Sequence, residues 1–154
     1  MQRVVSQRPS SRPRCVRWAL LPLRLVVGSG FLIHGWAKWS RGPADFGRLL
    51  QHLGVPLPLP TAWLVTLLEV FGGIAILVGA FVVLVSIPLA VSMVVAMFTV
   101  HWHYGFSAVR TIGLTADGPL FGPPGYEISL LYLGALIAIA TAGPSALSVD
   151  ARAD

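Results

Sequence analysis

The stretch TAWLVTLLEVFGGIAILVGAF, residues 61–81, is apolar almost throughout, yet it carries Glu69 near its middle. A helix needs about 20 consecutive apolar residues to cross the hydrocarbon core of a bilayer. A charged side chain inside a bilayer is costly, and such residues normally face the interior of a helix bundle and pair with one another. The stretch therefore predicts a membrane-spanning helix, and Glu69 predicts polar partners on neighbouring helices.

The composition of the whole chain also indicates a membrane protein. Of its 154 residues, 55% are hydrophobic and 11% are charged, whereas soluble domains carry about 25% charged residues. Much of the net charge of +5 comes from an arginine-rich start. The basic residues that precede the first apolar run are Arg3, Arg8, Arg12, Arg14 and Arg17. A basic tail of this kind is typical of a membrane topology signal, and the sequence does not predict nucleic-acid binding.

The single cysteine, Cys15, lies in this basic region. One cysteine cannot form an internal disulfide or a dithiol pair that relays electrons. A redox role would therefore depend on an electron carrier in a partner protein.

The apolar blocks predict an all-α fold, a bundle of four transmembrane helices. The block at about 61–102 is two helices long, so we expect it to fold back after Gly79 and before Pro88. The predicted helices cover about 17–38, 61–79, 82–102 and 124–143. The predicted organisation is a disordered basic tail at 1–16, a membrane domain at 17–146 and a short C-terminal tail at 147–154.

The basic tail predicts a cytoplasmic N-terminus, and four spans return the C-terminus to the same side. A cleaved signal peptide is the alternative, but Arg24 inside the first apolar run argues against it. The first outer loop contains an amphipathic piece, Phe46 to Leu53, that we expect to lie along the surface. The second, residues 104–125, is rich in glycine and proline, and we expect an ordered cap or lid.

The ionisable residues fall mostly at the outer ends of the predicted helices, and Arg24 lies nearer the inner half. Glu69 shares a helix face with Thr66 and Gly73, and small residues on a face indicate contact between helices. The pattern predicts a polar cluster inside the bundle that opens outward. Its predicted outer members are His34, Lys38, Glu69, His101, His103, Arg110 and Glu127.

The partners within this cluster stay open. Lys38 or Arg24 would pair with Glu69, and His34, His101 or Arg110 would pair with Glu127. Each group has two interpretations, a structural bond that locks helices together or a functional site that binds a ligand or carries protons. The HWH at 101–103 does not predict a metal site, because residues i and i+2 of a helix point about 160° apart.

Several short motifs occur in a fixed order along the chain. LRLVVGSGFLIHGWAKW (23–39) comes first, LLEVFGG (67–73) follows, HW (101–102) closes the third helix and GYE (125–127) opens the fourth. This order, over about residues 20–150, resembles the DoxX family of small bacterial four-helix membrane proteins. The resemblance implies a site formed by Arg24, His34, Lys38, Glu69, His101, Trp102 and Glu127. The chain departs from the family at GAFVVLVS (79–86), where members often carry a Thr-Arg pair.

The resemblance also implies a function, because the family is named for its similarity to a subunit of a quinol oxidase and thiosulfate:quinone oxidoreductase system. We therefore expect a redox-linked, quinone-associated subunit of the bacterial plasma membrane that acts with partner proteins. Whether the chain itself catalyses a reaction stays open. The alternatives are a small-solute carrier, for which a homo-oligomer would provide more room, and a non-enzymatic scaffold that docks redox enzymes.

Overall fold

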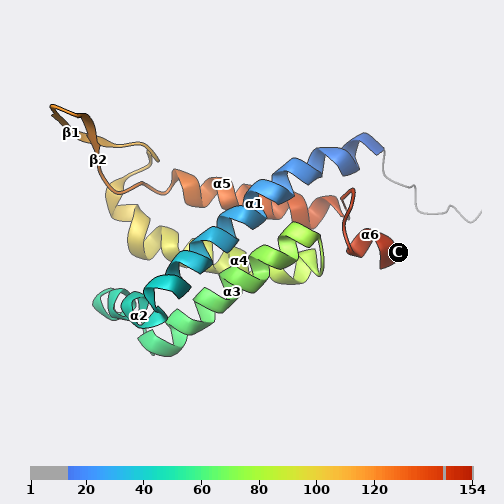
Figure 1. Ribbon diagram of the computed structural model, residues 1–154, viewed down its shortest axis with the longest axis horizontal. Coiled ribbons are helices and arrows are strands. Elements are labelled where there is room, and N and C mark those ends of the chain that lie inside the picture. Colours follow the sequence, from blue (N-terminus) through green and yellow to red (C-terminus); the bar gives the residue numbers. More distant parts are fainter. Residues whose placement is uncertain (1–13, 144, 154) are drawn as a thin grey trace, which may run out of the picture.

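The computed structural model describes residues 14–143 and 145–153, and most of them are helical (Figure 1). The helices are α1 (Arg14–Arg41), α2 (Pro43–His52), α3 (Pro58–Val78), α4 (Val82–Ala96), α5 (Glu127–Ala142) and the short α6 (Asp150–Ala153). A π-helical turn (Met97–His101) and a 3-10 turn (Trp102–Tyr104) extend α4. An antiparallel hairpin of β1 (Thr111–Thr115) and β2 (Gly118–Phe121) then precedes α5.

Three helical segments in the described residues are long and apolar enough to cross a membrane. They are Trp18–Arg41, Pro58–Val78 and Val82–Tyr104. The fourth, α5, is apolar but has 16 residues, or about 24 Å at 1.5 Å per residue. The hydrocarbon core is about 30 Å thick. The sequence predicts four spans. The described residues contain three candidate spans and a shorter apolar helix.

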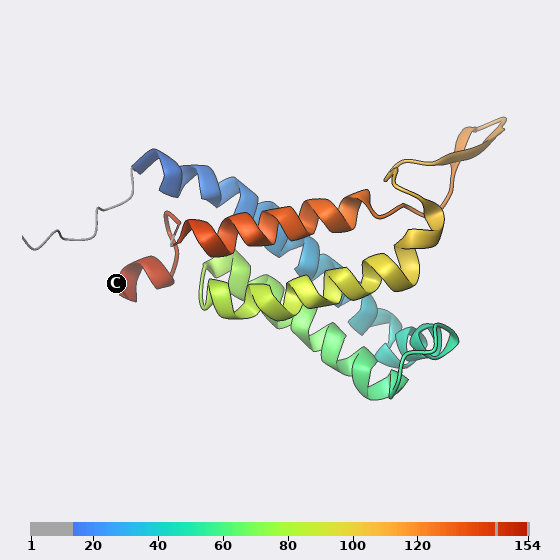
Figure 2. The ribbon, with the colours of Figure 1, turned by 180° about the vertical axis from the view of Figure 1, so that it is seen from behind.

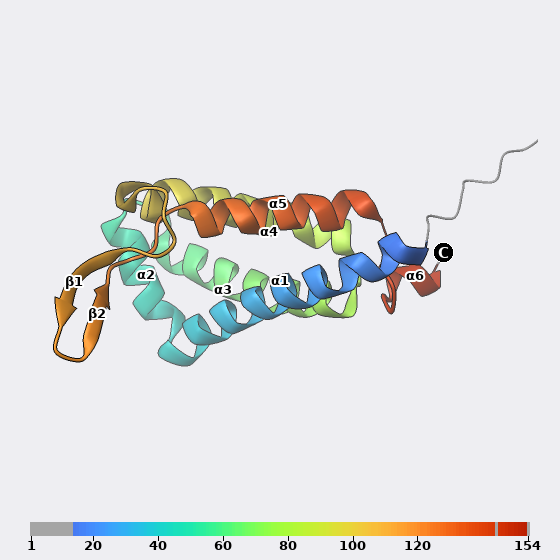
Figure 3. The same ribbon diagram turned by 90° about the horizontal axis from the view of Figure 1, so that it is seen from above.

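Helices α1, α3, α4 and α5 form a ring in which each packs against two neighbours (Figures 2 and 3). α1 packs most extensively along α3, while α4 packs along α5. The start of α1 and the short α6 lie together at one end of the bundle, which we call the terminal end. α2 and the hairpin lie at the other, the hairpin end. Towards the hairpin end, the α1–α3 pair diverges from the α4–α5 pair (Figure 2).

The apolar core joins the two helix pairs. Its buried members are Val27 and Phe31 on α1, Ile76 on α3, Leu89 on α4, and Leu136 and Ile139 on α5. Residues of α3 and α4 that lie close to the α3–α4 turn contribute to this core, so it closes the half of the bundle nearer the terminal end. The buried groups of α3 nearer the hairpin end include the polar Thr66 and Glu69.

Glycines permit the close packing of α1 on α3. A Cβ atom at Gly28 would lie 2.9 Å from the amide nitrogen of Leu77. A Cβ atom at Gly73 would lie 2.6 Å from the amide nitrogen of Leu32. Real Cβ atoms do not come this close to backbone, so these positions require glycine. The predicted contact face around Gly73 is therefore the face that α3 presents to α1.

The predicted reversal of the chain after Gly79 is confirmed. Gly79 ends α3 in the left-handed conformation at φ 69°, and Phe81 precedes α4 at φ 52°. Left-handed residues commonly end helices because the reversed backbone satisfies the last carbonyls. Pro88 lies inside α4, beyond the turn.

Other predicted boundaries shift by a few residues. α1 begins at Arg14, so its first turn includes the end of the segment predicted as a tail; residues 1–13 lie outside the described part. The fourth helix begins at Glu127 and not near 124; the amides of Gly125 and Tyr126 before it donate hydrogen bonds to the loop carbonyls of Ser107 and Gly105. The predicted ordered loop at 104–125 contains the β-hairpin.

Candidate functional site

An ion pair joins α1 to α3 in the hairpin half of the bundle. The Nζ atom of Lys38 donates a hydrogen bond to the Glu69 carboxylate. Glu69 is 7% exposed. Gly35, one turn before Lys38, brings the helices together, since a Cβ atom there would lie 2.9 Å from the Glu69 Cβ. Of the two partners that the sequence leaves open for Glu69, the structure has Lys38.

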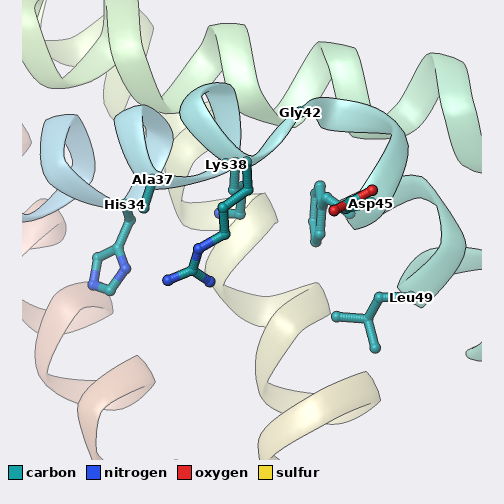
Figure 4. Close-up of a pocket in the computed structure, with 8 residues that line it drawn as sticks. His34, Ala37, Lys38, Gly42, Asp45 and Leu49 are labelled. Carbon is teal, nitrogen blue, oxygen red and sulfur yellow. The ribbon is translucent and has the colours of Figure 1, made fainter.

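A cavity of about 390 Å³ lies beside this ion pair, between the end of α1 and helix α2 (Figure 4). Its lining residues are His34, Ala37, Lys38, Arg41, Gly42, Asp45, Phe46 and Leu49. Gly42 connects the two helices at φ 95°, a conformation that favours glycine. The predicted amphipathic piece near Phe46 is helical and forms one wall of this cavity.

The cavity presents nitrogen donors beside an aromatic ring. His34, Lys38 and Arg41 follow one another at intervals of four and three residues, so they share one face of α1. The Lys38 Nζ lies 5.0 Å from the centroid of the Phe46 ring, a distance at which a cation is attracted to the ring face. Asp45 accepts a hydrogen bond from Arg48, so its charge is partly compensated. Among the described residues, Arg41 has no acidic partner within ion-pair distance.

Three other predicted site residues, His101, Trp102 and Glu127, lie at the base of the hairpin. His101 Nδ1 lies 3.0 Å from the carbonyl oxygen of Pro124, and the Trp102 ring stacks on Tyr126 with centroids 5.0 Å apart. The Glu127 carboxylate accepts a hydrogen bond from the amide of Ala108 at 2.7 Å. These contacts attach the loop after α4 to the start of α5. Glu127 therefore bonds to backbone here, and not to one of the three basic side chains proposed from the sequence.

Arg24 belongs to a separate site at the terminal end. It is 3% exposed, and its guanidinium donates to Ser145 Oγ and to the carbonyls of Ala146 and Leu147. We call residues 145–150 the C-terminal clasp, because they bind back to the α3–α4 turn. The amide of Val149 donates to the carbonyl of Val78 at 3.1 Å. Much of the segment predicted as a short C-terminal tail is therefore packed against the bundle.

The clasp continues to the start of α4 through Asp150. Its two carboxylate oxygens accept hydrogen bonds from the amides of Phe81 at 2.9 Å and Val82 at 3.1 Å. The first amides of a helix lack intrahelical partners, and a carboxylate there also complements the helix dipole. Arg24 lies at the opposite kind of helix end, beside Gly79 at the C-terminus of α3. The charges of Arg24 and Asp150 thus match the dipoles of the two helix ends.

Replacement of Asp150 by asparagine is expected to lower the free energy of unfolding by about 1 kcal/mol, because one cap oxygen and the charge are lost. Thermal unfolding of the purified protein in detergent measures this change. Asp117→Asn, at the exposed tip of the hairpin, is the matched control and should leave stability unchanged. Equal stability of the two variants would contradict the capping role of Asp150.

The seven predicted site residues thus divide into three groups. The structure brings together His34, Lys38 and Glu69, it places His101, Trp102 and Glu127 at the hairpin base, and it binds Arg24 to the clasp. Sequence reasoning missed Arg41 and Phe46 as cavity residues. The spacing of Arg41 from Lys38 was the available signal, but it carries weight only if the first helix extends past residue 38. No group of three or more possible metal ligands lies within the described ranges.

The comparison with family models bears on these groups. The family model described as DoxX matches residues 19–102, more than half of the chain. The matched range includes every predicted site residue except Glu127. The same comparisons found no matching curated protein and no matching solved structure. With its apolar helices and the family's match across α1, α3 and α4, the chain belongs to the DoxX family.

Proposed function

We propose that this DoxX protein is a membrane subunit that binds the head group of a quinone in the cavity beside α2. The observation that carries the proposal is the donor face of α1 next to an aromatic ring, in a cavity of about 390 Å³. A quinone is a flat ring with two carbonyl oxygens that accept hydrogen bonds. His34 and Arg41 are the nitrogen donors available to those oxygens, and Phe46 offers a ring for packing against the quinone plane.

The position of the cavity also suits a ligand dissolved in lipid. Ile33 and Trp36, on the same turns of α1 as His34, are 65% and 61% exposed, so the helix presents apolar surface beside the cavity. Tryptophan is enriched where membranes meet water. A polar head group would occupy the cavity while its isoprenoid tail remains in the bilayer along this surface.

Oxidation of a quinol to a quinone releases two electrons and two protons. The His34 imidazole has a nitrogen that can accept a proton, which makes it the group suited to take one from a bound quinol. The two electrons would pass to a redox group of a partner protein, since the chain has a single cysteine. In this proposal the chain binds and orients the quinol, and the partner completes the reaction.

The terminal half of the bundle favours a protein that binds a ligand from one side, and not one that transports a solute across the membrane. Between the Lys38–Glu69 pair and the buried Arg24 lie the apolar residues of the core, including Val27 and Phe31. The clasp then covers the α3–α4 turn. A solute carrier would need a polar route through this region.

We extend the proposal to the arrangement in the membrane. α5 packs along α4 and also touches α1, which supports a fourth, short span. The start of α1 and the end of the clasp lie at the same end of the bundle (Figure 1). With the basic tail on the cytoplasmic side, both of these ends would face the cytoplasm of a bacterial cell, and the cavity would open near the outer surface of the plasma membrane.

Titration of the purified protein with a short-chain ubiquinone analogue and with a naphthoquinone analogue tests this function. Binding should quench the fluorescence of tryptophans near the cavity, such as Trp36. Arg41→Gln and His34→Ala should each weaken binding about tenfold, the usual effect of losing one hydrogen bond of about 1.4 kcal/mol. The controls Arg110→Gln and His103→Ala, which change exposed residues outside the cavity, should bind like the unmodified protein.

Two results would contradict the proposal. Equal affinity in all four variants would place quinone binding elsewhere. No binding by the unmodified protein would instead favour a scaffold or a carrier, and solute flux in proteoliposomes would separate those two.

A further inference from the structure

Tyr132 of α5 extends across the bundle to α1. Its ring meets the Phe31 ring edge to face, with centroids 5.1 Å apart. Its hydroxyl occupies the space where a Cβ atom of residue 30 would lie, and its Cζ is 2.8 Å from that position. A larger residue at position 30 would force this side chain to move. The end of the ring is therefore held against α1 by Phe31 and Gly30.

The hydroxyl of Tyr132 lies one helical turn below the cavity. Gly30 and His34 are four residues apart on α1, so they share a face and are separated by about 6 Å along the helix axis. His34 is the cavity-lining residue nearest the middle of the membrane-spanning part of α1. The phenol thus lies below His34 on the face of α1 that the two residues share, just beyond the residues that line the cavity.

Packing alone does not account for the hydroxyl group. A phenylalanine at position 132 would make the same edge-to-face contact with Phe31 and would need less space beside Gly30. The hydroxyl of a half-buried tyrosine usually has a hydrogen-bond partner. Within the described part of the chain, the Tyr132 hydroxyl forms no hydrogen bond with another side chain or with the backbone.

We infer that Tyr132 is a further residue of the binding site, whose hydroxyl donates a hydrogen bond to the ligand oxygen that lies deepest in the cavity. This inference rests on the proposed function, because it takes the ligand to be a quinone. His34 and Arg41 come from the α1–α3 pair, and Tyr132 comes from the α4–α5 pair. The ligand would therefore be held between the two helix pairs that diverge towards the hairpin end (Figure 2).

Tyr132→Phe tests the inference, because it removes the hydroxyl and keeps the ring. We expect the affinity for the ubiquinone analogue to fall about 5- to 10-fold, as for one lost hydrogen bond. The thermal stability of the ligand-free protein should stay unchanged. Tyr104→Phe, at the hairpin end and outside the cavity, is the matched control and should bind like the unmodified protein.

A second variant separates the hydroxyl from the position of the ring. Gly30→Ala displaces the phenol from α1, so both affinity and thermal stability should fall. Unchanged affinity in Tyr132→Phe, while the unmodified protein binds the analogue, would overturn the role of Tyr132 and leave the proposed function standing. Absence of binding by the unmodified protein would overturn both.

Discussion

Gly73→Ala is expected to force α1 away from α3 and to lower the free energy of unfolding by about 1–3 kcal/mol. The added methyl group would lie 2.6 Å from the amide nitrogen of Leu32 and 2.9 Å from the carbonyl oxygen of Gly28. Both are backbone atoms of α1, so no side chain can rotate to relieve the contact. Alanine favours a helix over glycine by up to about 1 kcal/mol, which does not offset this overlap.

The measurement is thermal or denaturant unfolding in detergent, with Gly134→Ala on α5 as the matched control. Nothing lies within 4 Å of the position that a Cβ at Gly134 would take. That variant should be as stable as the unmodified protein or slightly more stable. If both variants unfold alike, the close approach of α1 and α3 does not limit stability, and the packing described for Gly73 is wrong.

Lys38→Met is expected to cost about 1–3 kcal/mol, and Glu69→Gln somewhat less. Breaking a buried ion pair in a soluble protein costs about 3–5 kcal/mol, whereas polar contacts between membrane helices average about 0.6 kcal/mol. This pair is intermediate, because the side chains of Lys38 and Glu69 are 24% and 9% exposed. Loss of Lys38 leaves the more deeply buried charge alone. Loss of Glu69 leaves an ammonium that can reach into the cavity on its flexible stem.

A double-mutant cycle measures this interaction. The variant with both substitutions should be more stable than the sum of the single losses predicts, with a coupling energy of about 1 kcal/mol or more. The exposed pair of Arg48 and Asp45, whose side chains are 75% and 57% exposed, is the control cycle. Its coupling should be near zero, as for most surface pairs. Additive losses at Lys38 and Glu69 would show that their contact contributes little to joining α1 and α3.

The sequence alone predicts the class of protein and much of its helical order. Long apolar runs identify membrane helices because each residue contributes to hydrophobicity independently of its neighbours. The reversal after Gly79 was also readable, since an apolar run of two helix lengths has to fold back. Glu69 predicts polar partners because a lone charge in an apolar helix is costly. All of these signals are local or additive along the chain.

The sequence predicts the length of α5 less well. The apolar run from about residue 124 suggests a full span, but the helix begins only at Glu127, after the hydrogen bonds that attach Gly125 and Tyr126 to the preceding loop. The sequence predicts the hairpin only as an ordered loop. Its two strands have five and four residues, too few for a clear alternating pattern. Boundaries of this kind depend on which backbone groups find partners, and the partners here are residues near Gly105, about 20 positions earlier.

Apolar runs and short motifs are enough to identify the membrane helices, the costly polar residues that need partners, and the family. Which partners meet depends on how the helices pack. The tertiary structure pairs Glu69 with Lys38, 31 positions away, and binds Arg24 to Ser145, 121 positions away. It also brings α2 beside His34 to form the cavity and Tyr132 beside Gly30. The physical reason is that burial cost is a property of each residue, whereas pairing depends on how packed helices are rotated and how closely glycines let them approach.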